Sequence, residues 1–357
     1  MAKITQLTLA RILEGKMAGR PQSVGIMDVV PLLPQDETHH NRMFAVPTKD
    51  MLLAGNPTYG TVVVANKDTS QPLIVPSNTT WITKHRAQDH AMSKAGLLGA
   101  GGMGTYDNAA CVQSSQGGSI PADIYRFQIL PATLRRVDKA LAEEKKYSKL
   151  WDNISAMNRF LGVRTDMAHL EFLFTQFDKE LSQFVAEFET IPRQIGALVI
   201  INGQLVGVEI APSPAYWRSV WEPLIRFCYG PEALMAARQL GEEGVKSAVL
   251  SRPRLDNRNV ASIEDLERAL EDLRNAERSR TEQIVMKELE ISLAFEVDDE
   301  IKVRSAGIGS TTYRLASSFE GFVGQVVVDE DYVVYASLVN KKSVPKRPAR
   351  KGFRFLS

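Results

Sequence analysis

Short apolar runs, separated by glycine, proline and asparagine, dominate the first part of the chain. Residues 24–33 form an apolar run that stops at Pro34, and residues 61–65 form a valine-rich run. Apolar runs of this length between turn-forming residues are typical of β-strands. Further strands are predicted over 73–75, 109–112 and 124–129.

Apolar positions then recur every three or four residues between about 132 and 188, which predicts a helical insertion. Gly162 is a plausible stop inside this region, and Pro192 ends it. The recurring apolar positions are Leu134, Val137 and Leu141, then Leu150, Ile154, Met157 and Leu161, and finally Leu170, Leu173, Phe177, Leu181, Phe184 and Phe188.

The clearest local signal is the dipeptide Asn202-Gly203 between two apolar runs, 197–201 and 204–210. A two-residue loop of this composition accepts positive φ at both positions, so it predicts a β-hairpin with a type I′ turn. Two helices are expected next, over about 215–228 and 231–240.

The pattern after residue 240 predicts a linker, a long helix and further strands. Residues 241–261 are polar and irregular. A charged helix follows from Ser262 to Glu290, and its narrow apolar stripe is suited to a partner helix in the same molecule or in a second subunit. The stripe is Ile263, Leu266, Leu270 and Leu273, and the later strands are expected over 295–303, 310–316, 322–328 and 332–339.

These elements predict an α+β protein with a mixed or antiparallel β-rich core. We expect a core domain over 1–240 with the helical insertion at 132–188, a linker at 241–261, and a unit of long helix and strands at 262–340. The last segment, 341–357, holds seven basic and no acidic residues and is expected to be a mobile tail.

Charge and composition narrow the classes of partner. With 43 basic and 42 acidic residues among 357, the net charge of +1 argues against a nucleic-acid coat or a membrane-surface protein. The basic tail keeps nucleic acid open as a partner.

The sequence has no apolar run long enough to predict a membrane span, and the start of the chain does not resemble a signal peptide. With two cysteines and no disulfide framework, a cytoplasmic location is the simpler interpretation.

The densest cluster of polar side chains lies between Thr83 and Ala91. If this segment is helical, a histidine and an aspartate four residues apart share a face and could relay a proton. An ordinary solvated, salt-bridged surface remains the alternative. The residues concerned are Lys84, His85, Arg86, Gln88, Asp89 and His90.

A second polar segment begins at the end of a predicted strand, with Cys111, Gln113 and Gln116. Cys111 could be a nucleophile if a neighbouring cation stabilised its thiolate, or it could be a small buried residue, which is the usual role of a free cysteine. Amides do not titrate, so Gln113 and Gln116 are better suited to hydrogen-bonding a ligand than to acid–base chemistry. Cysteines and histidines at zinc-finger spacing are absent, and the sequence does not identify a cofactor.

The order of these features resembles the ARG-and-rhodanese-phosphatase-associated protein domain family over about residues 1–235. That family has a strand ending in Pro-Leu-Leu, a Gln-Asn dipeptide, a Cys-Val-Glu strand before Gly-Arg-Trp, a Gly-Ala hairpin and a tryptophan-containing helix. The matching segments here are Val29–Leu33, Gln88-Asp89, Cys111–Gln113 with Gly117-Gly118, Gln194–Glu209 and Tyr216–Tyr229. Asp89 replaces the asparagine, Gln113 replaces the glutamate, and the Arg-Trp pair is missing. The genomic neighbourhood of the family implies a role in or near ADP-ribose or NAD metabolism and RNA repair.

The sequence therefore predicts a pocket for a nucleotide or an ADP-ribose-like small molecule, made where the two polar segments meet. Lys84 and Arg86 would bind phosphate, while Gln88, Gln113 and Gln116 would bind ribose or base. His85, Asp89 and His90 would transfer any proton, and Cys111 would line the pocket. The alternative is a structural or self-assembling interaction protein, such as a homo-oligomer, that uses the 262–290 helix and the basic tail.

Overall fold

The computed structural model describes most of the chain, in eleven stretches. These are residues 4–36, 43–54, 60–83, 89–107, 109–114, 125–143, 148–165, 167–239, 262–305, 309–318 and 320–343. The predicted linker and nearly all of the basic tail lie outside them.

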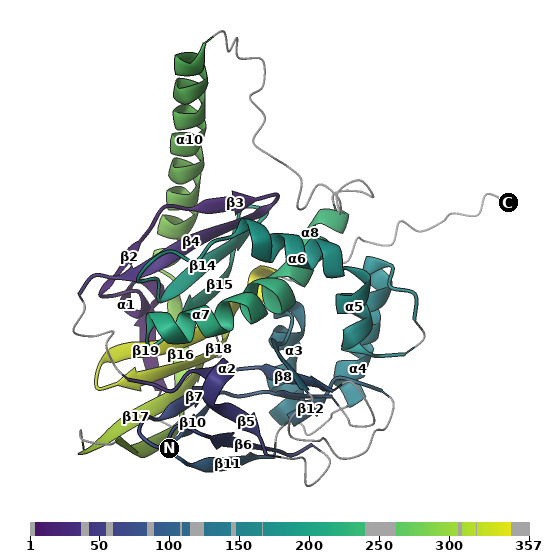
Figure 1. Cartoon of the computed structure of the whole chain (residues 1–357), viewed down its shortest axis with the longest axis vertical. Helices are drawn as coiled ribbons and strands as arrows, with labels where there is room; N and C mark the ends of the chain where they lie inside the picture. The colour runs from purple at the N-terminus through teal and green to yellow at the C-terminus, as the bar shows by residue number, and fades with distance from the viewer. Residues whose placement is uncertain are drawn as a thin grey trace, which may run out of the picture.

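A large, curled antiparallel sheet of ten strands forms the frame of the molecule (Figure 1). Its order is β1 (Ile4–Thr8), β16 (Ser292–Ser305), β17 (Gly309–Ser318), β18 (Phe322–Asp329), β19 (Tyr332–Asn340), β15 (Gln204–Ile210), β14 (Gly196–Ile201), β4 (Met27–Pro34) and β2 (Lys16–Ala18), and β3 (Gln22–Val24) also pairs with β4. Strands from both sides of the predicted linker pair directly, since β15 lies beside β19. The α+β class is confirmed, whereas the domain boundaries stay a prediction.

Both faces of the large sheet are buried, as the alternation along β14 shows. Ala197, Val199 and Ile201 belong to the apolar core under the helices, while Leu198 and Ile200 belong to the core on the opposite face. Alternate residues of a strand point to opposite faces, so an apolar run without polar breaks is what a strand covered on both sides requires.

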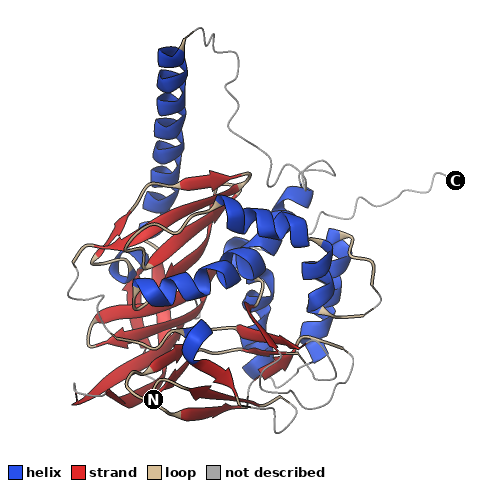
Figure 2. Cartoon of the chain, viewed as in Figure 1, coloured by secondary structure: helices blue, strands red, loops and turns tan. Residues whose placement is uncertain are grey.

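Helices from the middle of the chain cover one face of the sheet (Figure 2). The predicted helical insertion is confirmed as α3 (Ala132–Glu143), α4 (Ser148–Leu161), α5 (Leu170–Gln176) and α6 (Asp178–Glu187). The two helices expected after the hairpin form one continuous helical path, α7 (Pro214–Glu222), the π-helix η1 (Pro223–Tyr229) and α8 (Gly230–Gln239). The opposite face carries α1 (Leu9–Ile12) and part of α10 (Ile263–Leu289). Among the described helices, none has the length and apolar composition to cross a bilayer.

Three small antiparallel sheets complete the fold. One pairs β5 (Met51–Leu53), β6 (Val62–Asn66) and β11 (Met103–Tyr106), near α2 (Pro47–Asp50), and another pairs β7 (Leu73–Val75) with β10 (Gly96–Leu98). The third has the order β12 (Ala109–Cys111), β9 (His90–Met92), β8 (Thr79–Thr83) and β13 (Tyr125–Ile129). This third sheet carries the segments that the sequence predicts to be functional.

The hairpin has the predicted geometry, with φ of 50° at Asn202 and 75° at Gly203. Gly203→Ala should lower the free energy of unfolding by about 1 kcal/mol, because a side chain disfavours the left-handed region. Urea unfolding measures this, with the exposed neighbour Gln204→Ala as the control. Equal losses in the two variants would contradict the assignment of the effect to backbone conformation.

Candidate functional site

The four-stranded sheet brings the two polar segments out at one end. Thr83, the last residue of β8, pairs with Tyr125, the first residue of β13. His90, the first residue of β9, pairs with Cys111, the last residue of β12. Two connections therefore start and finish at the same end of this sheet. One runs from β8 to β9 and the other from β12 to β13.

Hydrogen bonds join the two segments where they leave the strands. The side-chain oxygen Oε1 of Gln113 accepts a bond from the backbone N–H of Asp89 at 3.3 Å. In the next rung, the backbone N–H of Val112 donates to the carbonyl of Asp89 at 3.0 Å. Asp89, His90, Cys111 and Gln113 thus lie close together, while their role in a ligand pocket stays a prediction.

The remaining predicted site residues, Lys84, His85, Arg86, Gln88 and Gln116, lie outside the described residues. Their placement in the pocket stays a prediction. What the structure fixes is where their two segments are anchored.

Cys111 is almost completely buried, and its environment favours the packing role over the nucleophilic one. Burial raises the pKa of its thiol, and the thiol donates a hydrogen bond to the carbonyl of Gln113 at 2.9 Å. The indole N–H of Trp151 in α4 donates to the Cys111 carbonyl at 2.9 Å, which ties the strand end to the helical insertion. A neutral thiol is a poor nucleophile.

The structure adds a third segment, 168–170, which the sequence does not connect with the other two. His169 pairs with Gln113 in an isolated antiparallel bridge, and the backbone N–H of Leu170 donates to the Val112 carbonyl at 3.2 Å. Among the described residues, Nε2 of His169 is buried with no hydrogen-bond partner, as is Oδ1 of nearby Asn158. Buried polar atoms are nearly always satisfied, so these two mark a place where a further hydrogen-bonding group would be favourable.

A second polar cluster, between the large sheet and α3, was not predicted at all. Arg135 is 2% exposed. Its guanidinium donates hydrogen bonds to four side chains, which lie on β15, β19, η1 and the turn before β8. Its partners are Oε1 of Glu209 at 3.0 Å, Oγ of Ser337 at 2.7 Å, Oδ1 of Asn78 at 3.2 Å and Sγ of Cys228 at 3.4 Å.

The π-helix η1 supplies two members of this buried cluster. Tyr229 donates from its hydroxyl to Oε1 of Glu209 at 2.5 Å. Burial raises the pKa of Cys228 to about 12, so this thiol is neutral as well. π-helical turns are frequent at functional sites. However, the cavity that Arg135 lines is only about 10 Å³, which is space for about one water. The cluster therefore acts chiefly as a bridge between α3, η1 and the sheet.

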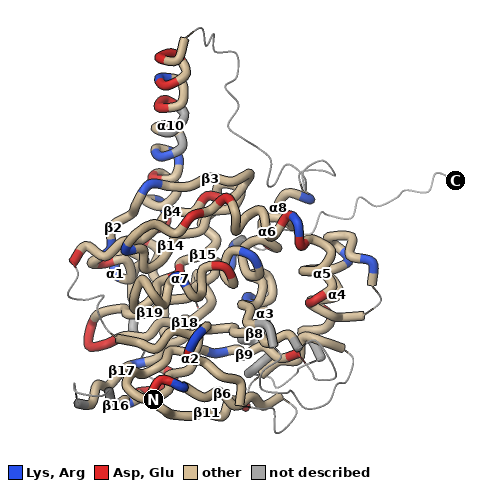
Figure 3. The backbone as a smooth tube through the Cα atoms, in the orientation of Figure 1, with Lys and Arg blue, Asp and Glu red and all other residues tan. Residues whose placement is uncertain are grey.

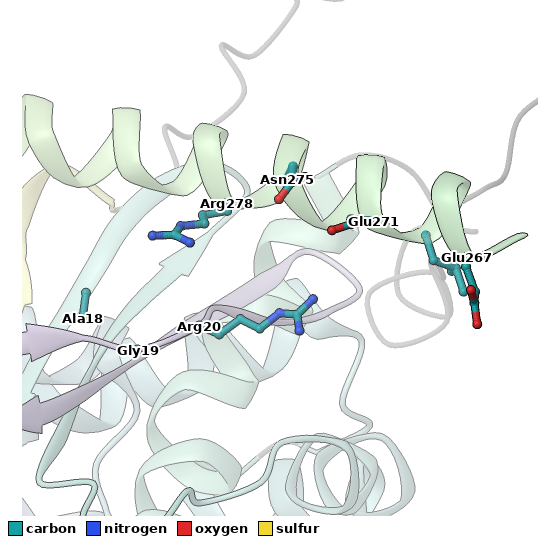
Figure 4. Close-up of a pocket in the computed structure, with 8 residues that line it drawn as sticks. Ala18, Gly19, Arg20, Glu267, Glu271, Asn275 and Arg278 are labelled. Carbon is teal, nitrogen blue, oxygen red and sulfur yellow. The ribbon is translucent and has the colours of Figure 1, made fainter. Parts of the chain in front are cut away.

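Larger hollows lie on the other side of the sheet, beside α10 (Figure 4). A groove of about 850 Å³ runs between α10 and the β2–β3 connection, and Arg20 and Arg278 extend into it from its two walls. It shares Ala18, Gly19 and Arg278 with an adjacent, mostly apolar groove of about 460 Å³. Basic and acidic side chains both line the pair of grooves, so they do not select a ligand by charge.

Lys16 borders the apolar groove and gives a pH-dependent prediction. Burial lowers its pKa from 10.5 to about 8, although Glu14 opposes the shift. Between these two values the unfolded chain holds more protons than the folded one, so the contribution of Lys16 to stability rises with pH. Urea unfolding from pH 7 to pH 10 should show this rise in the parent but not in Lys16→Met. The exposed Lys49→Met is the control, and parallel curves for Lys16→Met and the parent would contradict the prediction.

No curated protein and no solved structure is detectably similar to this chain. A family model, the ARG and Rhodanese-Phosphatase-superfamily-associated Protein domain, matches residues 17–339. The match extends beyond the resemblance seen in residues 1–235 and takes in the long helix and the C-terminal strands. Because the model covers most of the chain, including every strand of the four-stranded sheet, the protein belongs to the ARG and Rhodanese-Phosphatase-superfamily-associated Protein domain family.

Proposed function

We propose that the protein binds a nucleotide or an ADP-ribose-like small molecule at the end of the four-stranded sheet where its two polar segments emerge. The observation that carries the proposal is the pairing of His90 with Cys111, reinforced by the hydrogen bond from the Asp89 amide to Gln113. This pairing sets His90, in the first polar segment, beside Cys111, in the second, at the end of the sheet where the proposal places the pocket. Loops held by a rigid sheet are a common place for binding residues.

The residue types at this edge suit a phosphorylated, hydrogen-bonding ligand. Lys84 and Arg86 carry the positive charge that phosphate groups require, and an arginine can bind phosphate with two parallel hydrogen bonds. Gln88, Gln113 and Gln116 offer both donors and acceptors to a ribose or a base. His169, whose backbone pairs with that of Gln113, adds its unsatisfied Nε2 as a further hydrogen-bonding atom.

Proton transfer, if the ligand is turned over, falls to His85, Asp89 and His90. Asp89, just before β9, is 3% exposed and His90, its first residue, is 0% exposed, so in this proposal a proton would pass between these two residues and the ligand through His85. Neutral Cys111 has no nucleophilic part in this proposal.

Thermal unfolding in the presence of ligands tests the proposal. We expect ADP-ribose, NAD or ADP to raise the melting temperature of the parent protein, because a ligand that binds only the folded state stabilises it by mass action. The variant Lys84→Ala/Arg86→Ala should lose the shift for phosphorylated ligands. Gln88→Ala and His169→Ala should each reduce it.

Lys49→Ala is the matched control, because Lys49 is an exposed lysine on α2 and belongs to neither polar segment. It should keep the full shift. If no nucleotide stabilises the parent protein, or if Lys84→Ala/Arg86→Ala responds as strongly as the parent, the proposed site is wrong.

A further inference from the structure

A polar groove of about 620 Å³ lies between α10 and the turn of the β14–β15 hairpin. Arg280, Gln283 and Lys287 line it from α10, because residues three, four and seven apart share one face of a helix. The opposite wall is the turn, residues 202–205. A β-carbon at Gly203 would lie 3.2 Å from Nη2 of Arg280, so the guanidinium lies against the turn. The groove shares no residue with the four-stranded sheet of the proposed binding site.

Hydrogen bonds from a buried side chain hold the end of this groove in place. Asn340, the last residue of β19, is 6% exposed and lines the groove. It donates from Nδ2 to the carbonyl of Leu205 at 3.0 Å, and its Oδ1 accepts the backbone N–H of Lys342 at 2.9 Å. These bonds tie the end of β19 to the start of β15 and position the 3₁₀ turn η2 (Lys341–Ser343) at the rim.

Three exposed cations, Arg280, Lys287 and Lys342, line the groove. Figure 3 shows basic residues on α10 where the helix reaches the sheet. Within the part of the chain that the structure describes, none of the three forms an ion pair. By contrast, Arg278 in the same helix pairs with Glu282 at 2.8 Å. The groove therefore presents positive charge that the protein itself does not compensate.

The remaining polar residues of the groove leave its charge positive. Glu288 is the one acidic residue that lines it, and Oε2 of this carboxylate is buried. Asn202, Gln204 and Gln283 add exposed side-chain amides, whose N–H groups donate hydrogen bonds. Cations and amide donors together suit an anion with several oxygen acceptors.

We propose that this groove binds the sugar–phosphate backbone of a single-stranded nucleic acid. Arg280 and Lys287 are seven residues apart, which is about 10 Å along the helix axis. A strand carries a negative charge on every nucleotide, so a strand lying along α10 presents phosphates to both side chains. Contacts to phosphate and sugar carry no sequence information, so the binding is independent of base sequence.

The sequence after the rim favours a nucleic acid over an acidic peptide. Residues 344–357 contain five basic residues, no acidic residue and two phenylalanines, Phe353 and Phe355. Proteins that hold single strands combine cations for the phosphates with aromatic side chains on which bases stack. An acidic peptide lacks the bases that such aromatic residues recognise.

Fluorescence anisotropy with the full chain tests the proposal. The probes are labelled oligouridine and oligothymidine of about ten nucleotides, which distinguish RNA from DNA as the ligand. Binding of either probe is expected. For the parent, the dissociation constant should rise with salt, because each phosphate contact adds about 0.7 to the slope of log Kd against log salt. Arg280→Gln/Lys287→Gln should bind at least about 10-fold more weakly at low salt and lower this slope by about 1.4, the share of two contacts.

Arg268→Gln/Lys49→Gln is the matched control, because it removes the same net charge from two exposed cations that do not line the groove. It should bind like the parent, and circular dichroism verifies that both variants keep their helix. No binding of either probe by the parent, or equal binding by Arg280→Gln/Lys287→Gln, would overturn the proposal. So would displacement of the probe by polyglutamate as effective as displacement by the unlabelled strand, since the groove would then recognise acidic chains in general.

Discussion

Arg135→Leu is expected to lower the free energy of unfolding by about 3–5 kcal/mol, because it leaves the Glu209 carboxylate buried without its cation. Both side chains are almost inaccessible, with 1% and 5% of their side-chain surface exposed. The substitution also removes the hydrogen bonds from Arg135 to Asn78 and Ser337. Urea unfolding of the parent and the variant gives the difference.

An exposed ion pair supplies the matched control. Arg278 donates to Glu282 at 2.8 Å, but 68% and 59% of their side-chain surfaces are exposed. Surface pairs contribute about 0–1 kcal/mol, so Arg278→Leu should change stability little. The double variant Arg135→Leu/Glu209→Leu should recover part of the loss, since no charge remains buried there. A double variant no more stable than Arg135→Leu alone would contradict this account.

Gly207→Ala should cost about 3 kcal/mol or more. A β-carbon at this position of β15 would overlap the hydroxyl and ring of Tyr229. Tyr229 is fully buried and donates to Glu209, so it can move only by breaking that hydrogen bond and disturbing the packing around η1. Thermal or urea unfolding measures the loss.

Gly96→Ala is a matched comparison, since a β-carbon there would overlap the hydroxyl of Tyr106 in the same way. Tyr106 is only partly buried, so it can rotate toward solvent. We expect a smaller loss than for Gly207→Ala. Equal losses would show that confinement of the tyrosine is not the cause.

Local signals in the sequence predict the individual helices and strands of this fold well. They do not predict which strands pair with one another. The turn at Asn202-Gly203 and the helix that begins after Ser262 depend on residues a few positions apart. The pairing of β15 with β19 and of β1 with β16 joins distant parts of the chain. Apolar alternation shows that a strand is buried and gives no information about which strand lies beside it.

The same limit explains what could be predicted of the site. A hydrogen bond joins Asp89 and Gln113, one from each polar segment, while the pocket that the sequence predicts there stays a prediction. Nothing in the sequence of residues 168–170 indicates that they pair with residues 112–114. Arg135 looks like any charged residue on an amphipathic helix. Its burial arises only when Asn78, Glu209 and Ser337 converge on it from separate elements.

The position of β19 in the middle of the large sheet has a consequence for synthesis on the ribosome. β18 and β15 flank β19, so until residues 332–340 have emerged the two halves of the sheet have no strand to join them. The exposed edge of β15 in the nascent chain is a template for pairing with other chains. A truncation before Tyr332 should therefore aggregate rather than fold into a smaller version of the protein.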